Sequence, residues 1–206
     1  MEEAVIVSIV RTPVGKAPRG ALHDTRPEEL AALVIGEALR RVPALAPAEV
    51  DDVIMGCAMP EGPQGLNLGR IAAIRAGLPT SVSAMTVNRF CSSGLQSIAL
   101  AAQQIMSGMG DIIVAGGVES MSSVPMSGFK PAPDPYLMAN YPQIYMSMGH
   151  TAEEVAQRFG IGRSRQDEFA LRSHERAAAA IDAGRFTEET VPVELTQVRI
   201  DEDGRQ

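Results

Sequence analysis

The stretch VNRFCSSGLQSIALAAQQIMSGMGDIIVAGGVESM, residues 87–121, places a cysteine directly before a helical pattern and a buried strand directly after it. Apolar residues follow Cys91 in steps of three and four, which is typical of one face of a helix. Residues 111–118 (DIIVAGGV) are then almost continuously apolar, which indicates a buried strand. Strands of this kind, connected through helices, are typical of a parallel sheet.

The same alternation extends back to the N-terminus. β-Branched or apolar runs predict strands, and segments with apolar residues on one face predict helices. In chain order we expect a strand at 4–10, a helix at 27–42, a strand at 53–58, a helix at 66–76 and a strand at 84–87. This order predicts an α/β fold: a mostly parallel sheet flanked by helices on both faces.

The pattern changes after about residue 121. Residues 121–149 hold five of the eleven methionines, all three tyrosines and repeated prolines, which predicts a long excursion without regular structure. Such loops are usually functional or disordered. A capping-box pattern at Thr151 predicts a helix to Gly160, and a second helix is expected at 164–184. The final segment, 191–206, is predicted to be a strand that enters an Asp-Gly turn.

Composition bounds the possible functions. The 206 residues suit one large domain or one domain plus part of a second, and 45% of them are hydrophobic. The formal net charge of −7 disfavours nucleic acid or an anionic membrane as the main partner. No segment has the roughly 20 apolar residues of a membrane span. Two cysteines without a CxxC pair and three scattered histidines predict a soluble, cytoplasmic protein without a metal site.

Cys91 admits two interpretations. It falls where the predicted strand at 84–87 ends and the next helix begins, the edge at which ligands bind in α/β sheets. The backbone N–H groups and the dipole at a helix N-terminus stabilise a thiolate, so Cys91 suits a nucleophile. Free cysteines are also often small buried hydrophobes, and the residues alone leave both interpretations open. Cys57 lies inside an apolar strand pattern and is predicted to be a core residue.

The run VNRFCSSGLQSI, residues 87–98, resembles the N-terminal active-site signature of the thiolases. Further similar motifs follow in the expected order along almost the whole chain: RTPVGK near the start, GGVESMS at 116–122, MGHTAEEVA at 148–156 and DEFALRSHERAAAAI at 167–181. The sequence NRFCSSGLQ resembles degradative 3-ketoacyl-CoA thiolases more than biosynthetic acetoacetyl-CoA enzymes. The resemblance implies a thiolase-like sheet with an inserted loop domain.

The resemblance also implies a division of the chain. We expect a thiolase N-terminal α/β domain at 1–120 and an incomplete loop domain at 121–206. The motifs GHP, NEAF and CxGxG, with which the C-terminal half of a thiolase supplies the base, the second cysteine and oxyanion donors, do not occur in these 206 residues. The C-terminal thiolase half is therefore expected to be absent from this chain, and the chain alone is expected to be inactive.

In the family, the cysteine at the position of Cys91 attacks a 3-oxoacyl-CoA and carries the acyl group as a thioester. The resemblance implies the same catalytic role for Cys91, coenzyme A as a substrate and no cofactor, and a substrate-binding role for Met148 near the acyl group. His150 and His174 are not expected to be the base, and Ser147 stands where some thiolases have a nucleotide-contacting histidine. As partners, acyl-CoA, CoA and further copies of the chain in a homodimer or homotetramer are expected, with no nucleic acid and no membrane.

Two alternatives have different mechanisms. One is a ketoacyl synthase of the same superfamily, which condenses the acyl group on its cysteine with a malonyl thioester. The match at 148–181 disfavours it. The other is a non-catalytic thiolase-like protein that binds CoA or lipid and would not acylate Cys91.

Overall fold

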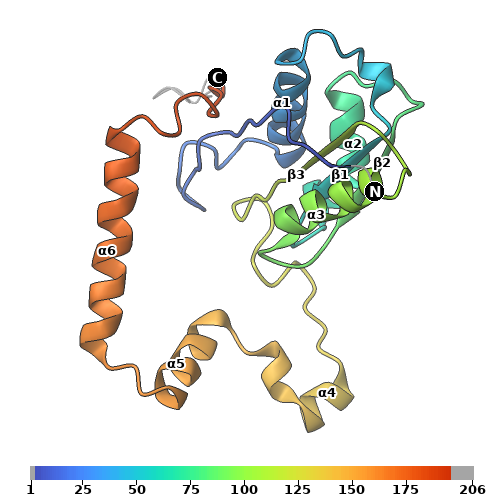
Figure 1. Cartoon of the computed structure of the whole chain (residues 1–206). Coiled ribbons are helices and arrows are strands. Elements are labelled where there is room, and N and C mark those ends of the chain that lie inside the picture. The colour runs from blue at the N-terminus through green and yellow to red at the C-terminus, as the bar shows by residue number, and fades with distance from the viewer. Residues whose placement is uncertain (1–2, 196–206) are drawn as a thin grey trace, which may run out of the picture. The chain divides into compact units, whose positions relative to one another are not determined.

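The structure, a computed structural model, describes residues 3–195 and divides into two compact units. Unit 1 contains the described residues up to Phe129 and those from Glu189 onward, and unit 2 contains Lys130–Glu188. Figure 1 shows the elements along the chain. The strand predicted at 191–206 lies mostly outside the described residues, and residues 191–195 are not in a strand.

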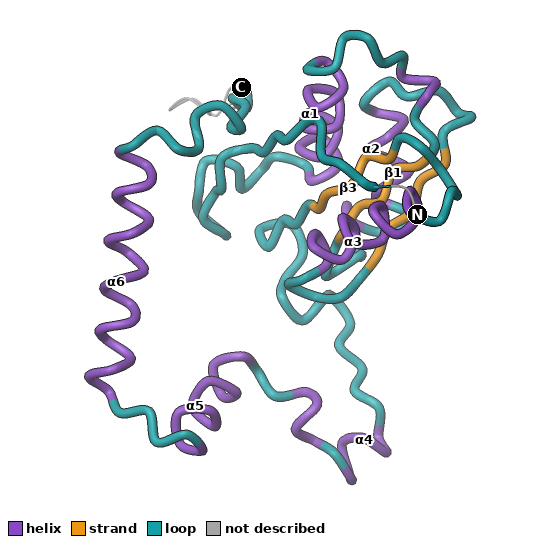
Figure 2. The backbone as a smooth tube through the Cα atoms, in the orientation of Figure 1, coloured by secondary structure: helices purple, strands orange, loops and turns teal. Residues whose placement is uncertain are grey.

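Unit 1 is built on a three-stranded parallel sheet in the order β2-β1-β3. The strands are β1 (Asp52–Gly56), β2 (Ser83–Val87) and β3 (Ile113–Gly117). They run in register, so that Gly56 pairs with Val87 on one side and with Gly117 on the other. All three strands therefore end at one edge of the sheet. The strands are the orange segments of the tube in Figure 2. The predicted parallel α/β sheet is confirmed.

Helices cover both faces of this sheet. Helices α1 (Pro27–Arg40) and α2 (Leu68–Arg75) pack against the face to which Val53 and Met55 point. Apolar residues of these elements and of the loops beside them form the buried core: Ala31, Ile35, Val50, Val53, Met55, Ala72, Ala73, Leu78 and Val82. Two 3₁₀ turns, η1 (Pro47–Glu49) and η2 (Gly62–Gln64), flank β1.

Helix α3 (Ser93–Met106) packs on the opposite face and comes unusually close to the strands. A Cβ atom at Gly56 would overlap the backbone of Ser93 and would lie 2.6 Å from the nitrogen of Gly94. A Cβ atom at Gly117 would lie 3.3 Å from the Cα atom of Gly94. Backbone thus rests on backbone, and glycine is required at Gly56 to permit this approach.

The predicted strand at 4–10 is wrong. These residues are extended but are not paired in a ladder with another described strand, and the side chain of Val7 is 75% exposed. Their polar groups bond to α1 instead. The hydroxyl of Ser8 donates to the carbonyl of Ala38 at 3.0 Å, and Arg41 donates to the carbonyl of Ile9 at 3.1 Å. A β-branched run specifies an extended backbone, but a strand also needs a partner.

Unit 2 is more helical than the sequence predicted. The 121–149 segment was expected to lack regular structure, but it contains α4 (Pro135–Asn140) and η3 (Pro142–Tyr145). Asp134 caps α4 by accepting a hydrogen bond from the N–H of Leu137 at 2.9 Å, and Pro135 occupies the first turn. Capping aspartate followed by proline is a helix-start signal.

The last two helices are α5 (Met148–Arg158) and α6 (Arg163–Asp182). The predicted capping box at Thr151 is wrong, because α5 begins earlier and Ser147 is its N-cap. The hydroxyl of Thr151 donates instead to the carbonyl of Ser147, 3.1 Å away, one turn back in the helix. In the described residues, no helix is long and apolar enough to cross a membrane.

The close contact beneath α3 makes Gly56 a sensitive position. Gly56→Ala is expected to destabilise the protein by about 2 kcal/mol, because the added methyl overlaps the backbone of Ser93, which cannot rotate away. Gly36→Ala is the matched control: nothing lies within 4 Å of its Cβ position in α1. That change is expected to be stabilising by about 0.5–1 kcal/mol. Urea unfolding of both variants checks the pair, and equal effects would contradict the packing argument.

Candidate active site

Cys91 lies at the edge of the sheet where the parallel strands end. Strand β2 ends at Val87, residues 88–92 turn the chain, and α3 begins at Ser93. The loops that follow β1 and β3 leave the same edge. In α/β sheets, this carboxyl edge is where ligands bind, and the predicted position of Cys91 between strand and helix is confirmed.

The turn that carries Cys91 is tight and closed by its own polar groups. Phe90, the residue directly before the cysteine, has a φ of +46°, which is uncommon for a residue other than glycine. The N–H of Phe90 donates to Oδ1 of Asn88 at 2.8 Å. The N–H of Arg89 donates to the hydroxyl of Ser93 at 2.8 Å, and that hydroxyl donates to the carbonyl of Phe90 at 2.6 Å. The backbone around the thiol is therefore well specified.

Helix α3 is fixed to the sheet by a buried hydroxyl one turn further on. Ser97 is fully buried, and its Oγ lies 2.7 Å from the carbonyl oxygens of Gly94 and of Gly116 in β3. This bond and the glycine contacts below it hold the N-terminus of α3 against the strands. These contacts set the position of the start of the helix, and with it that of Cys91, relative to the strands.

Cys91 is exposed, so it is not a small buried hydrophobe. Cys91 lies directly before Ser92, the N-cap of the fourteen-residue helix α3. The N–H groups of a first helical turn lack intrahelical partners, and the helix dipole favours negative charge at this end. An exposed sulfur in this position can reach a ligand and carry an acyl group.

Cys57 has the opposite environment. It follows β1, is only 1% exposed, and its Sγ lies 3.8 Å from Oε1 of Glu119. Burial, and then the nearby negative charge of Glu119, raise the pKa of the Cys57 thiol to about 12. Cys57 is therefore a neutral core thiol, as the sequence predicted, and not a competing nucleophile.

Gln64 and Glu119 connect the loops around the site and were not found in the sequence. The carboxylate of Glu119 accepts hydrogen bonds from the N–H of Ala58 at 2.6 Å and from Nε2 of Gln64 at 2.6 Å. Gln64 is fully buried, donates to the carbonyl of Met59 at 2.8 Å and accepts from the N–H of Ser120. These bonds join the loop after β1 to the loop after β3. Glu119 lies in the motif GGVESMS, whereas no motif in the sequence marked Gln64.

The other residues singled out in the sequence lie in unit 2. Met148 begins α5 and its side chain is exposed. His150 shares a hydrogen bond with the hydroxyl of Ser147, with Nδ1 and Oγ 2.9 Å apart. Because Met148 belongs to unit 2 and Cys91 to unit 1, the substrate-binding role of Met148 stays a prediction. In the described part of the chain, no three His, Cys, Asp or Glu side chains gather in a way that could hold a metal ion.

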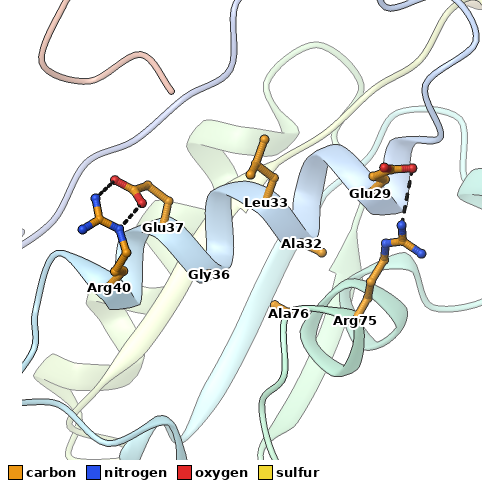
Figure 3. Close-up of a pocket in the computed structure, with 8 residues that line it drawn as sticks. All are labelled: Glu29, Ala32, Leu33, Gly36, Glu37, Arg40, Arg75 and Ala76. Atoms are coloured by element: carbon orange, nitrogen blue, oxygen red, sulfur yellow. Dashed lines mark hydrogen bonds and ion pairs between the residues drawn. The ribbon is translucent and has the colours of Figure 1, made fainter. Parts of the chain in front are cut away.

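A groove of about 380 Å³ on α1 is drawn in Figure 3. Its charged side chains are paired with one another: Glu29 lies 3.4 Å from Arg75, and Glu37 lies 2.6 Å from Arg40. Hydrogen bonds from Arg40 and Arg41 lower the pKa of Glu37 to about 2, so this carboxylate is not available as an acid. The groove lies on the α1–α2 layer, whereas Cys91 lies in the turn before α3, the helix on the other face of the sheet.

The fold and this site define an α/β protein with an exposed cysteine at a strand-to-helix turn. The family described as "Thiolase, N-terminal domain" matches residues 4–205. The chain therefore belongs to the thiolase family.

Individual relatives agree with this assignment. The chain is 54% identical over 203 residues to the 3-ketoacyl-CoA thiolase of Bacillus subtilis (strain 168), covering 98% of this chain and 52% of that protein. It is 44% identical to the 3-ketoacyl-CoA thiolase of Shewanella loihica, covering 94% of this chain and 50% of that one. The crystal structure of the Bacillus anthracis acetyl-CoA acetyltransferase matches 100% of this chain and 56% of its own, with a TM-score of 0.83 and 38% identity. The chain thus spans about half the length of the curated relatives that it matches.

The contrast between the two cysteines can be measured directly. In the native protein at pH 8, iodoacetamide is expected to modify Cys91 and to leave Cys57 unmodified. With a pKa of about 12, Cys57 has a thiolate fraction on the order of 10⁻⁴ at that pH. Peptide mapping by mass spectrometry reports both sites, and 6 M guanidinium (roughly enough to unfold most domains) should release Cys57. Equal native labelling of the two cysteines would contradict the assigned environments.

Proposed function

We propose that this protein is a thiolase-type acyltransferase that cleaves 3-oxoacyl-CoA with CoA to give acyl-CoA and acetyl-CoA, or catalyses the reverse condensation. The observation that carries the proposal is the exposed Cys91 at the start of α3, inside the signature VNRFCSSGLQSI of a chain that belongs to the thiolase family. Relatives named 3-ketoacyl-CoA thiolase support the degradative substrate class.

In the proposed reaction, the sulfur of Cys91 attacks the ketone carbon C3 of the substrate and forms the C–S bond. The C2–C3 bond then breaks, and its electron pair stays on C2, which takes up a proton to give acetyl-CoA. The remaining acyl group, shorter by two carbons, is a thioester on Cys91. The thiol of free CoA loses a proton and attacks this thioester, so that acyl-CoA leaves and the Cys91 thiolate returns. Coenzyme A enters both steps as a substrate, first as its 3-oxoacyl thioester and then as the free thiol, and no cofactor is required.

The residues described in unit 1 supply the first part of this chemistry. Cys91 is exposed and held on a fixed turn, which suits a nucleophile that must meet a long substrate. The resemblance assigns the base, the second cysteine and further oxyanion donors to motifs that do not occur in these 206 residues. We accordingly propose that this chain turns over only together with a thiolase C-terminal half. The exposed apolar side chains on α3, among them Leu95 at 71% exposed, support packing of this helix against such a half.

Met148 is proposed to line the acyl pocket. Its exposed thioether at the first turn of α5 is available to an apolar ligand. Two free cysteines, one of them exposed, suit a reducing compartment and support a cytoplasmic location.

The acyl-enzyme is the direct test. The protein is incubated with acetoacetyl-CoA, with and without a thiolase C-terminal half, and the modified peptide is mapped. An acetyl adduct is expected on Cys91, and Cys91→Ser is expected to lower turnover by about 10⁴-fold or more, because the hydroxyl is a much weaker nucleophile near neutral pH. Cys57→Ser is the matched control and should acylate normally. With 3-oxoacyl-CoA substrates of several chain lengths, Met148→Ala should change the preferred chain length and not the acylated residue.

Three results would overturn this function. Acylation of Cys57 in place of Cys91 would remove the assigned nucleophile. Condensation with malonyl-CoA but no thiolysis of 3-oxoacyl-CoA would favour a ketoacyl synthase. Binding of CoA without an adduct on Cys91, even with the C-terminal half present, would favour a non-catalytic binding protein.

We also propose that copies of the chain associate as a homodimer or a homotetramer. In the 121–149 segment, several large apolar side chains are exposed, including those of Met126, Phe129, Tyr136, Tyr141 and Ile144. Exposed apolar groups of this number favour burial at an interface. Light scattering at micromolar concentration should give a mass at least twice that of one chain. A monomer under those conditions would contradict the proposal.

A further inference from the structure

Asn88 makes two hydrogen bonds in two directions at the turn that carries Cys91. It directly follows the last residue of β2, and two residues later comes Phe90 with its φ of +46°. The Oδ1 atom of Asn88 accepts the N–H of Phe90 at 2.8 Å. The Nδ2 atom donates to the carbonyl of Ala58 at 2.9 Å, in the loop after β1. One side chain therefore holds both the shape of the turn and its place on the sheet.

The first bond acts on the conformation of the turn. A left-handed backbone costs free energy for a residue with a Cβ atom and persists only where the surroundings hold it. The hydrogen bond from the N–H of Phe90 to Oδ1 of Asn88 is one of those constraints. If this bond were lost, Phe90 could relax and move Cys91 away from the start of α3.

The second bond connects the turn to the rest of the site. Both backbone polar groups of Ala58 are hydrogen-bonded: its carbonyl accepts from Nδ2 of Asn88, and its N–H donates to the carboxylate of Glu119 in the loop after β3. Ala58 thereby joins the three loops that leave the carboxyl edge of the sheet. A change at Asn88 would release the Cys91 turn from this framework and leave the Glu119 contacts in place.

A primary amide is the group that these two bonds require. Asparagine offers a donor and an acceptor on one short planar group, whereas a carboxylate accepts only and a methyl does neither. We infer that Asn88 is the positioning residue of the nucleophile: it holds Phe90 left-handed and ties the turn to Ala58, so that Cys91 stands at the N-terminus of α3. This inference rests on the proposed function, in which Cys91 carries the acyl group.

The test is the rate at which iodoacetamide alkylates Cys91 in the purified protein, with Cys57 as an internal report on folding. Asn88→Ala is expected to slow alkylation of Cys91 about tenfold, the effect of one or two lost hydrogen bonds on a required geometry. Asn88→Asp, which keeps the acceptor for Phe90, is expected to recover part of the rate. Asn140→Ala is the matched control, since Asn140 donates to the carbonyl of Tyr136 at 2.8 Å in unit 2, and it should alkylate like the wild type.

A second set of variants, made in protein that carries Phe90→Gly, separates a positioning role of Asn88 from a general loss of structure. Phe90→Gly removes the cost of the left-handed backbone, so the turn depends less on Asn88. In that background, Asn88→Ala should slow alkylation by no more than about threefold. A purely structural role would give the same loss in both backgrounds.

Each outcome decides the matter. Wild-type alkylation in Asn88→Ala, or an undiminished loss in the Phe90→Gly background, would overturn the inference. If Asn88→Ala unfolds and labels Cys57, then Asn88→Asp is compared with the wild type instead, and equal rates there would overturn it. Alkylation needs no acyl-CoA, so a failure of Cys91 to become acylated would count against the proposed function and not against the positioning role of Asn88.

Discussion

The close contact between the start of α3 and the ends of β1 and β3 is the constraint on which the rest of the site depends. Gly56 and Gly117 present no side chain, so the backbone of Ser93 and Gly94 rests directly on the strands. Ser97 then bonds to the carbonyl of Gly116 and fixes the helix along its axis. Since Cys91 lies two residues before the first residue of this helix, its position relative to the sheet follows from packing of the main chain.

This arrangement solves a problem that a reactive thiol poses. A cysteine side chain is small and apolar enough to be buried, and burial raises its pKa, as Cys57 shows. A cysteine on a free loop would stay accessible but would have no fixed orientation. At Cys91, the immobile groups are those of the backbone on either side, and the sulfur itself remains exposed. Accessibility and orientation are thereby provided by different atoms.

The sequence predicted most of unit 1 because local patterns there agree with the tertiary contacts. Helix α3 and strand β3 follow from the spacing of apolar residues, and the site of Cys91 follows from the junction between strand and helix. The segment at 4–10 has the composition of a strand, but it forms no ladder with another described strand. Pairing depends on a second strand elsewhere in the chain, and a local sequence pattern contains no information about that strand. Helix α5 begins at Met148, and its N-cap is Ser147. The sequence did not predict this start, because Ser147 and Thr151 both carry a hydroxyl that can cap a helix and only the structure shows which one is used.

The residues that the sequence did not reveal share a physical feature. Asn88, Gln64 and Glu119 act through hydrogen bonds to backbone groups of Ala58 and Ser120 that are about 30 to 60 residues away, and periodicity carries no information about such bonds. Two of these bonds meet at Ala58, whose own side chain, a methyl, has no chemistry. A site built in this way depends on the position of a main chain as much as on the identity of its nucleophile. Two chains with the same cysteine could therefore differ in reactivity through a residue that never touches the substrate.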